Sequence, residues 1–116
     1  MATAAAKLKN LPISARKVRL VADMVRGKKV AEARDILSFA IKGSAEPLRK
    51  LLDSAVANAE NAASETHDRL DTDEMIVKTI MVNEGRTLQR FQPAPRGRAG
   101  RIRKRSSHIE LTITEK

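Results

Sequence analysis

The sequence contains no cysteine, tryptophan or tyrosine, and its only aromatic residues are Phe39 and Phe91. Without cysteine there is neither a disulfide framework nor a thiolate metal site. Two phenylalanines are too few for the aromatic platforms on which sheet proteins stack single-stranded bases. No apolar run approaches the roughly 18 residues that a membrane span needs, and the first ten residues lack the apolar core of a signal peptide. We therefore expect a cytoplasmic protein that folds without cross-links.

Motifs of catalysis are missing as well. The chain has no G-x-x-x-x-G-K-[ST] loop, no H-E-x-x-H pair and no cysteine nucleophile. The histidines, His67 and His108, lie far apart and do not predict a zinc site. The acidic stretch 68–74 lacks the spacing and the fixed glycine of an EF-hand, so a solvated loop is the simpler interpretation. The sequence predicts neither an enzyme nor a resident cofactor or metal.

Positive charge is present in excess, but it is distributed unevenly. The net charge of +9 and the pI of about 10.5 indicate a polyanionic partner, nucleic acid before an anionic membrane surface. Residues 1–29 include eight basic residues and one acidic residue. Residues 30–84 include six basic and eleven acidic residues, and residues 85–116 include nine basic and two acidic residues. Two basic blocks around an acidic middle predict two contact surfaces, or one surface built from both ends of the chain.

Apolar residues recur with helical spacing in three segments of the first half. Ser14 is a suitable N-cap for a helix over residues 15–26, which Gly27 is placed to end. A second helix is predicted over 30–41 and a third from Ser44, with a polar loop over residues 64–73.

The second of these helices is expected to bury one side in the core. Leu37 lies on its buried stripe, with Ile36 and Ile41 beside it. Phe39 follows Leu37 and is expected to pack in the core too.

The apolar spacing changes to that of strands in the second half. Residues 75–82 are β-branched and largely apolar, and residues 107–114 alternate apolar and polar. We expect these two strands to pair antiparallel beneath the helices, with a possible edge strand over 3–10. The predicted fold class is α+β: three helices packed on a small antiparallel sheet, with a long protruding basic β-hairpin. A single RNA-binding domain would then span residues 1–116, its globular part about 1–82 and 107–116 and its hairpin about 83–106.

The segment over residues 83–106 is the most unusual part of the chain. Seven arginines and one lysine lie between Glu84 and Glu110 with no acid among them. Because the flanking strands belong together, the segment must go out and return, reaching about 40 Å as an extended hairpin. Its turn is marked by four residues near the expected tip, namely Pro93, Pro95, Gly97 and Gly100.

Such a hairpin needs a partner. A two-stranded ribbon is marginal alone in water, and its cations repel one another, so a polyanion is expected to order it. Guanidinium groups bind phosphate bidentately and stack on bases, which suits folded RNA. A disordered basic tail is the alternative interpretation, but the strand that follows argues against it.

Three stretches are typical of one family. They are SARKVRLVADMVRGK at 14–28, AVANAENA at 55–62 and VNEGRTLQRFQPAPRGRAGRIRKRSSHI at 82–109. With these the chain resembles, nearly end to end, the bacterial form of the L twenty-two family of large-subunit ribosomal proteins. The resemblance implies a structural constituent of the large ribosomal subunit in the cytoplasm. It also implies that the protein binds 23S ribosomal RNA, supports subunit assembly and lines the nascent-polypeptide exit tunnel with its hairpin tip.

The predicted contacts follow from the basic blocks and from the resemblance. The expected ribosomal RNA contacts are Arg16, Lys17, Arg19, Arg26, Lys28, Lys29, Arg86, Arg90, Arg96, Arg98, Arg101, Arg103, Lys104, Arg105 and His108. The resemblance implies a tunnel-facing tip made of Leu88, Gln89, Arg90, Phe91, Gln92, Pro93, Ala94 and Pro95. It implies other large-subunit ribosomal proteins and the nascent polypeptide as further partners, with no membrane and no obligate homo-oligomer. A DNA-bending architectural protein with basic β-arms and an RNA-processing enzyme are the rival hypotheses.

Overall fold

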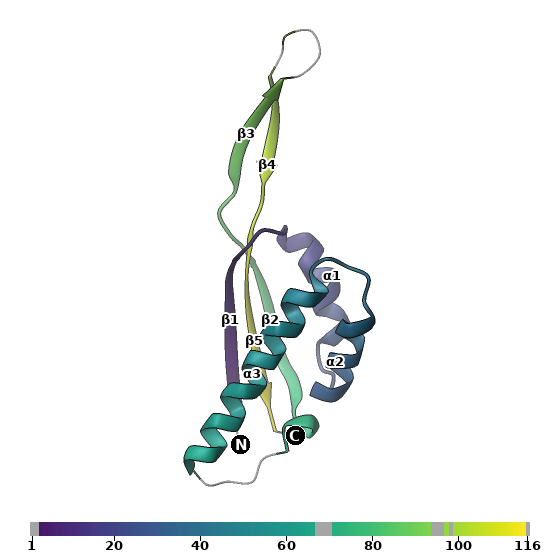
Figure 1. Ribbon diagram of the computed structural model, residues 1–116, viewed down its shortest axis with the longest axis vertical. Coiled ribbons are helices and arrows are strands. Elements are labelled where there is room, and N and C mark those ends of the chain that lie inside the picture. Colours follow the sequence, from purple (N-terminus) through teal and green to yellow (C-terminus); the bar gives the residue numbers. More distant parts are fainter. Residues whose placement is uncertain (1–2, 67–70, 94–96, 98, 116) are drawn as a thin grey trace.

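Three helices cover one face of an antiparallel sheet in the computed structural model, which describes residues 3–66, 71–93, 97 and 99–115 (Figure 1). The sheet has the strand order β1-β5-β2. Its strands are β1 (Thr3–Leu11), β2 (Ile76–Glu84) and β5 (Ser107–Thr114). The helices are α1 (Ala15–Val25), α2 (Val30–Phe39) and α3 (Ala45–Thr66). The α+β prediction is confirmed, including the antiparallel pairing of β2 with β5.

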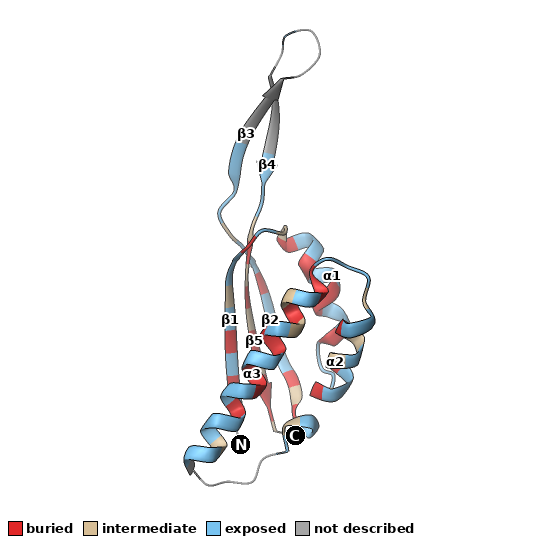
Figure 2. Ribbon diagram, viewed as in Figure 1, coloured by how far each residue is buried: buried red, intermediate tan, exposed pale blue. Residues whose placement is uncertain are grey.

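The apolar core lies between the helices and this sheet. The alternation in β5 places Ile109, Leu111 and Ile113 on the covered side, each at most 1% exposed. Val18 of α1 and Leu48 of α3 are fully buried in the same core. Figure 2 shows buried positions along both helices and along the strands of the sheet. Within the described ranges, no helix is long and apolar enough to cross a membrane.

The free edge of β2 is covered by the chain that joins α1 to α2. The Gly27 N–H donates to the Val77 carbonyl at 3.0 Å, and the Val77 N–H donates to the Lys28 carbonyl at 2.9 Å. Gly27 has φ +79°, a conformation that favours glycine, so it both ends α1 and turns the chain onto the strand. Backbone groups that an edge strand would leave open are thereby satisfied.

The predicted end of α2 was wrong. The helix stops at Phe39 because the next residue, Ala40, has extended backbone (φ −72°, ψ 134°). Helical spacing therefore does not continue to Ile41, which is 100% exposed, and Phe39 is 85% exposed instead of buried. Ala40 packs partly against the core in their place.

The remaining helix boundaries differ in smaller ways. Ser14 is the N-cap of α1, as predicted, but its side chain makes no capping hydrogen bond. The stretch predicted as a loop from residue 64 begins inside α3, which extends to Thr66, and it contains the short 3₁₀ helix η1 (Thr72–Glu74).

A second, two-stranded sheet continues from the main one as a ribbon (Figure 1). Its strands, β3 (Leu88–Pro93) and β4 (Ala99–Lys104), pair antiparallel from Leu88–Lys104 to Pro93–Ala99. The molecule is consequently elongated, with extents of 67, 26 and 16 Å. Gly100 pairs with Gln92 and Pro93 pairs with Ala99 inside the ribbon, so the predicted place of Gly100 and Pro93 in the turn was wrong. Gly97 lies beyond the paired strands with φ +70°, and Pro95 falls outside the described residues.

The ribbon joins the main sheet through Gly85, Arg86 and Ser106, and this junction with the adjoining ends of β3 and β4 is the foot of the ribbon. Past the last pair of β2 and β5, Glu84–Ser107, the Gly85 N–H donates to the Ser106 carbonyl at 2.9 Å. A Cβ at Gly85 would lie 2.6 Å from Ser106 Oγ, so a larger residue would displace that hydroxyl. The hydroxyl donates to the Arg86 carbonyl at 2.7 Å, which fixes the outgoing strand to the returning one.

Candidate nucleic-acid interface

The foot of the ribbon presents cations to solvent. The side chains of Arg86, Arg103, Lys104 and Arg105 are all exposed. Strands β3 and β4 pair with each other and with no other strand of the described chain. Because the ribbon is not packed into the body, these charges face outward on two sides and are open to a partner.

The other predicted ribbon contacts are placed only in part. Arg90 and Arg101 belong to β3 and β4, opposite Ile102 and Phe91 in the register. Arg96 and Arg98 lie outside the described residues. Of the predicted tip, Leu88 through Pro93 form the whole outgoing strand, while Ala94 and Pro95 fall outside the described residues. Leu88 lies at the foot, and the described pair farthest from the foot is Pro93–Ala99.

Two arginines of the first basic block bind the protein itself. Arg19 donates through Nε and Nη2 to the Val82 carbonyl, at 3.2 and 3.0 Å. Arg26 donates through Nη2 to the Ile80 carbonyl at 2.8 Å, and its Nη1 pairs with Asp23. Both carbonyls belong to β2, so these guanidinium groups satisfy backbone acceptors along that strand. Only the N–H groups that these bonds leave free can donate to a phosphate.

The other members of the first block differ in their pairing. Lys29 pairs with Glu74, with Nζ 3.2 Å from Oε2. Arg16, Lys17 and Lys28 are exposed, and within the described part of the chain none of them forms an ion pair. These three side chains are the ones in the block that are open to an anion.

A cavity joins the two basic blocks. It has a volume of about 270 Å³ and lies where the start of α1 meets the foot of the ribbon. Arg16 lines it from α1 and Arg105 from the ribbon, together with the acid Glu84. Hydroxyl-bearing residues from both sides, Ser14, Thr87 and Ser106, complete the lining. Of the two arrangements that the charge pattern allowed, this cavity favours one surface built from both ends of the chain.

His108 is held by the body of the protein. Its Nδ1 accepts a hydrogen bond from the Asn10 N–H at 3.1 Å, and the side chain is half-buried. Asn10 has φ +58°, so this contact supports an unusual backbone conformation at the bend before α1. The ring therefore links β1 to β5, and only its other nitrogen is available to a partner.

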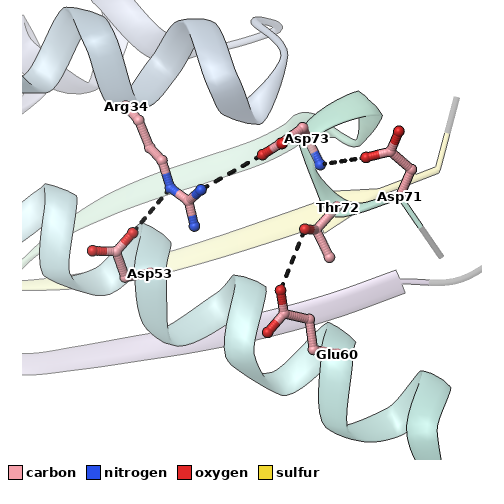
Figure 3. Close-up of polar contacts among 6 residues, drawn as sticks. All are labelled: Arg34, Asp53, Glu60, Asp71, Thr72 and Asp73. Atoms are coloured by element: carbon pink, nitrogen blue, oxygen red, sulfur yellow. Dashed lines mark hydrogen bonds and ion pairs between the residues drawn. The ribbon is translucent and has the colours of Figure 1, made fainter.

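Several acids of the middle segment are paired around η1, at the opposite end of the body from the ribbon (Figures 1 and 3). Arg34 bridges α2 to Asp53 of α3 at 3.1 Å and to Asp73 of η1 at 3.6 Å. Asp71 accepts from the Asp73 N–H at 3.1 Å. No cluster that could hold a metal ion occurs among the residues that the structure describes. The acids around η1 are thus separated in space from the cations at the foot of the ribbon, although Glu84 lies beside those cations.

Sequence reasoning missed two features of this surface. The arginine contacts to Val82 and Ile80 join residues more than fifty positions apart, and nothing local in the sequence indicates them. The residues Ser14 and Thr87 in the cavity were also missed, because one was read only as a helix cap and the other carries no charge. Arg19 of α1 and Arg26 at its C-cap lie seven residues apart, which places them on one stripe, but this spacing does not show whether they contact phosphate or the protein itself.

The chain matches a known protein family over most of its length. The family model described as ribosomal protein L22p/L17e matches residues 6–114, nearly the whole chain.

Proposed function

The chain belongs to the family of ribosomal protein L22p/L17e and is a protein of the large ribosomal subunit in the cytoplasm, where we propose that it acts as a scaffold that binds 23S ribosomal RNA. The observation that carries this proposal is the acid-free basic ribbon, which pairs only with itself and stands out from the body. Cations on a thin ribbon reach phosphates on both sides, which a flat surface cannot do. The ribbon would thereby brace several RNA segments and support subunit assembly.

The proposed contacts are the basic residues predicted from the sequence. Ribbon cations such as Arg103 and Arg105, and the open Arg16, Lys17 and Lys28, would carry most of the binding. Arg19, Arg26 and His108 would add contacts through the groups that their bonds to the protein leave free.

The far end of the ribbon is the part proposed to line the exit tunnel for nascent polypeptide. The tip predicted from the resemblance, residues 88–95, includes Pro93 of the Pro93–Ala99 pair, which the paired strands carry away from the body. In this proposal the protein works as one copy, and it positions RNA without catalysing a reaction, as suits a family of structural ribosomal proteins.

Sedimentation of a tagged chain tests the proposal. In a cell lysate separated on a density gradient, the tagged protein should travel with the large subunit. Purified protein should also bind a structured 23S ribosomal RNA fragment more tightly than duplex DNA of equal length. A preference for the DNA, together with a dimer in solution, would instead support the architectural rival. Turnover of the RNA by the purified protein would support the enzyme.

A further inference from the structure

One carboxylate lies among the cations where the two basic blocks meet. Glu84 is exposed and lines the cavity of about 270 Å³ between the start of α1 and the foot of the ribbon. Its carboxylate forms no ion pair and no hydrogen bond within the described part of the chain, although Arg16 and Arg105 line the same cavity. Binding of phosphate gains nothing from this carboxylate, because like charges repel. The proposed role of the surrounding cations therefore does not account for Glu84.

The cavity has the size and the lining of a site for one small polar group. Its volume lies just below the roughly 300–1,000 Å³ of pockets for drug-sized molecules, so a single nucleobase is a better match than a stacked pair. Two hydroxyl-bearing residues, Ser14 and Thr87, line it from opposite sides, and the Ser14 side chain is not used to cap α1. The lining thus combines two cations, one acid and two hydroxyl groups, which suits a ligand that carries both negative charge and hydrogen-bond donors.

We propose that this cavity binds one unpaired guanine of ribosomal RNA, whose N1–H and N2–H groups donate to the Glu84 carboxylate. Arg16 and Arg105, which line the cavity from α1 and from the ribbon, would hold the phosphate of that nucleotide through their guanidinium N–H groups. The inference rests on the proposed function and deepens it, because the guanine belongs to the RNA that the basic surface binds.

The carboxylate selects guanine among the four bases. An ionised carboxylate only accepts hydrogen bonds, and its two oxygens can accept two of them in parallel. The Watson–Crick edge of guanine has two adjacent donors, N1–H and N2–H. Adenine and cytosine have one amino group beside a ring acceptor, and uracil has one N–H between two carbonyls, so each of these bases would place an acceptor against a carboxylate oxygen. The guanine must be unpaired, because base pairing uses the same edge.

Other ligands fit the cavity less well. A phosphate alone, or a carboxylate of a partner protein, would meet the charge of Glu84 and would leave it without a donor. A metal ion or a lysine of a partner protein would be repelled by the two guanidinium groups. A nucleotide places its anionic and its donor groups in one molecule, so it can satisfy both signs of charge in the lining.

Chemical probing with kethoxal tests the inference, since this reagent adds to N1 and N2 of unpaired guanine. The full-length protein is bound to 23S ribosomal RNA, and hydroxyl radicals map its contacts to the RNA backbone in parallel. One guanine that reacts in free RNA should be protected by the wild-type protein inside the backbone footprint. With Glu84→Gln the footprint should persist, while the reactivity of that guanine rises by about 10-fold, an effect of the size expected for one base-specific hydrogen-bonded pair.

The matched control is Glu32→Gln. Glu32 is an exposed acid of α2 that forms no ion pair among the described residues, so this variant changes the net charge by the same amount at a distance from the cavity. It should protect the guanine as wild type does. Urea unfolding of Glu84→Gln should also match wild type, because the carboxylate bonds to no described part of the protein.

The outcomes separate this inference from the proposed function. A backbone footprint without a protected guanine, or equal protection by Glu84→Gln and wild type, would overturn the inference alone. The same holds for equal loss of protection in Glu32→Gln, which would indicate net charge, and for a lower stability of Glu84→Gln, which would indicate a role in the fold. Absence of any footprint on 23S ribosomal RNA would overturn the proposed function, and this inference with it.

Discussion

Replacing Arg86, Arg103, Lys104 and Arg105 together with glutamine is expected to remove most of the salt dependence of ribosomal RNA binding. These four side chains are exposed at the foot of the ribbon, and the domain does not use them to build its core. Glutamine keeps the length and polarity of the side chains while removing the charge that displaces counterions from RNA. The measurement is the dissociation constant for a structured 23S ribosomal RNA fragment over a series of salt concentrations.

The expected size of the effect follows from counterion release. If about six cations engage phosphate, log affinity falls against log salt with a slope near −4 to −5, or about 500-fold between 50 and 200 mM salt. With four of the six removed, the slope should be near −1.5 and the loss about 10-fold. A variant that kept the wild-type slope would show that the foot of the ribbon does not contact phosphate.

A matched control separates local contact from total charge. The variant with Lys42, Arg49, Lys50 and Lys78 replaced by glutamine loses the same net charge from residues outside both basic blocks. Its slope should stay close to that of wild type in the assay with isolated RNA. Equal effects of the two quadruple variants would mean that net charge, and not the ribbon, determines binding.

Replacing Leu111 with alanine is expected to destabilise the domain by about 3 kcal/mol, within the range of 2–5 kcal/mol for buried leucine. Leu111 is 1% exposed and lies on β5, the strand that pairs with both β1 and β2. Folded domains are stable by only about 5–15 kcal/mol, so this is a large fraction of the total. Urea unfolding followed by circular dichroism measures the change.

The control for this variant lies on the other face of the sheet. Met81 pairs with Glu110, the neighbour of Leu111, and is 50% exposed. Met81→Ala should change the free energy of unfolding by less than about 0.5 kcal/mol. A loss of under about 1 kcal/mol for Leu111→Ala would contradict the description of β5 as the centre of the core.

Much of the fold could be predicted because its local signals agree with its packing. The alternation over residues 107–114 fixed which side of β5 is buried, and Gly27 marked the end of α1 with the positive φ that the turn requires. The ribbon could be predicted from a different argument, since two strands that pair must be joined by a segment that goes out and returns.

The remaining features depend on contacts that a local pattern does not encode. The helical periodicity of α2 continues in the sequence to Ile41, but the backbone of Ala40 is extended. Tertiary packing therefore overrides the local helix propensity at this point. Arg19 and Arg26 are indistinguishable in sequence from phosphate-binding arginines, yet their nearest partners are carbonyls of β2. The position of Leu88 at the foot of the ribbon depends on the register with Lys104, which composition does not reveal.

Positive and negative charges are concentrated at different ends of the protein. Exposed cations lie at the foot of the ribbon and at the start of α1, whereas paired acids lie around η1 at the other end of the body (Figure 1). Phosphate would be attracted to the first end and not to the second, so electrostatics alone would orient the ribbon toward RNA on approach.

If RNA stabilises the ribbon, hydrogen exchange of the backbone amides in β3 and β4 will depend on whether RNA is bound. We expect fast exchange at residues 88–93 and 99–104 in the RNA-free protein and strong protection in the complex with a 23S ribosomal RNA fragment, while β2 and β5 stay protected in both states. Amides of β3 and β4 that are already as protected as those of β5 without RNA would contradict it.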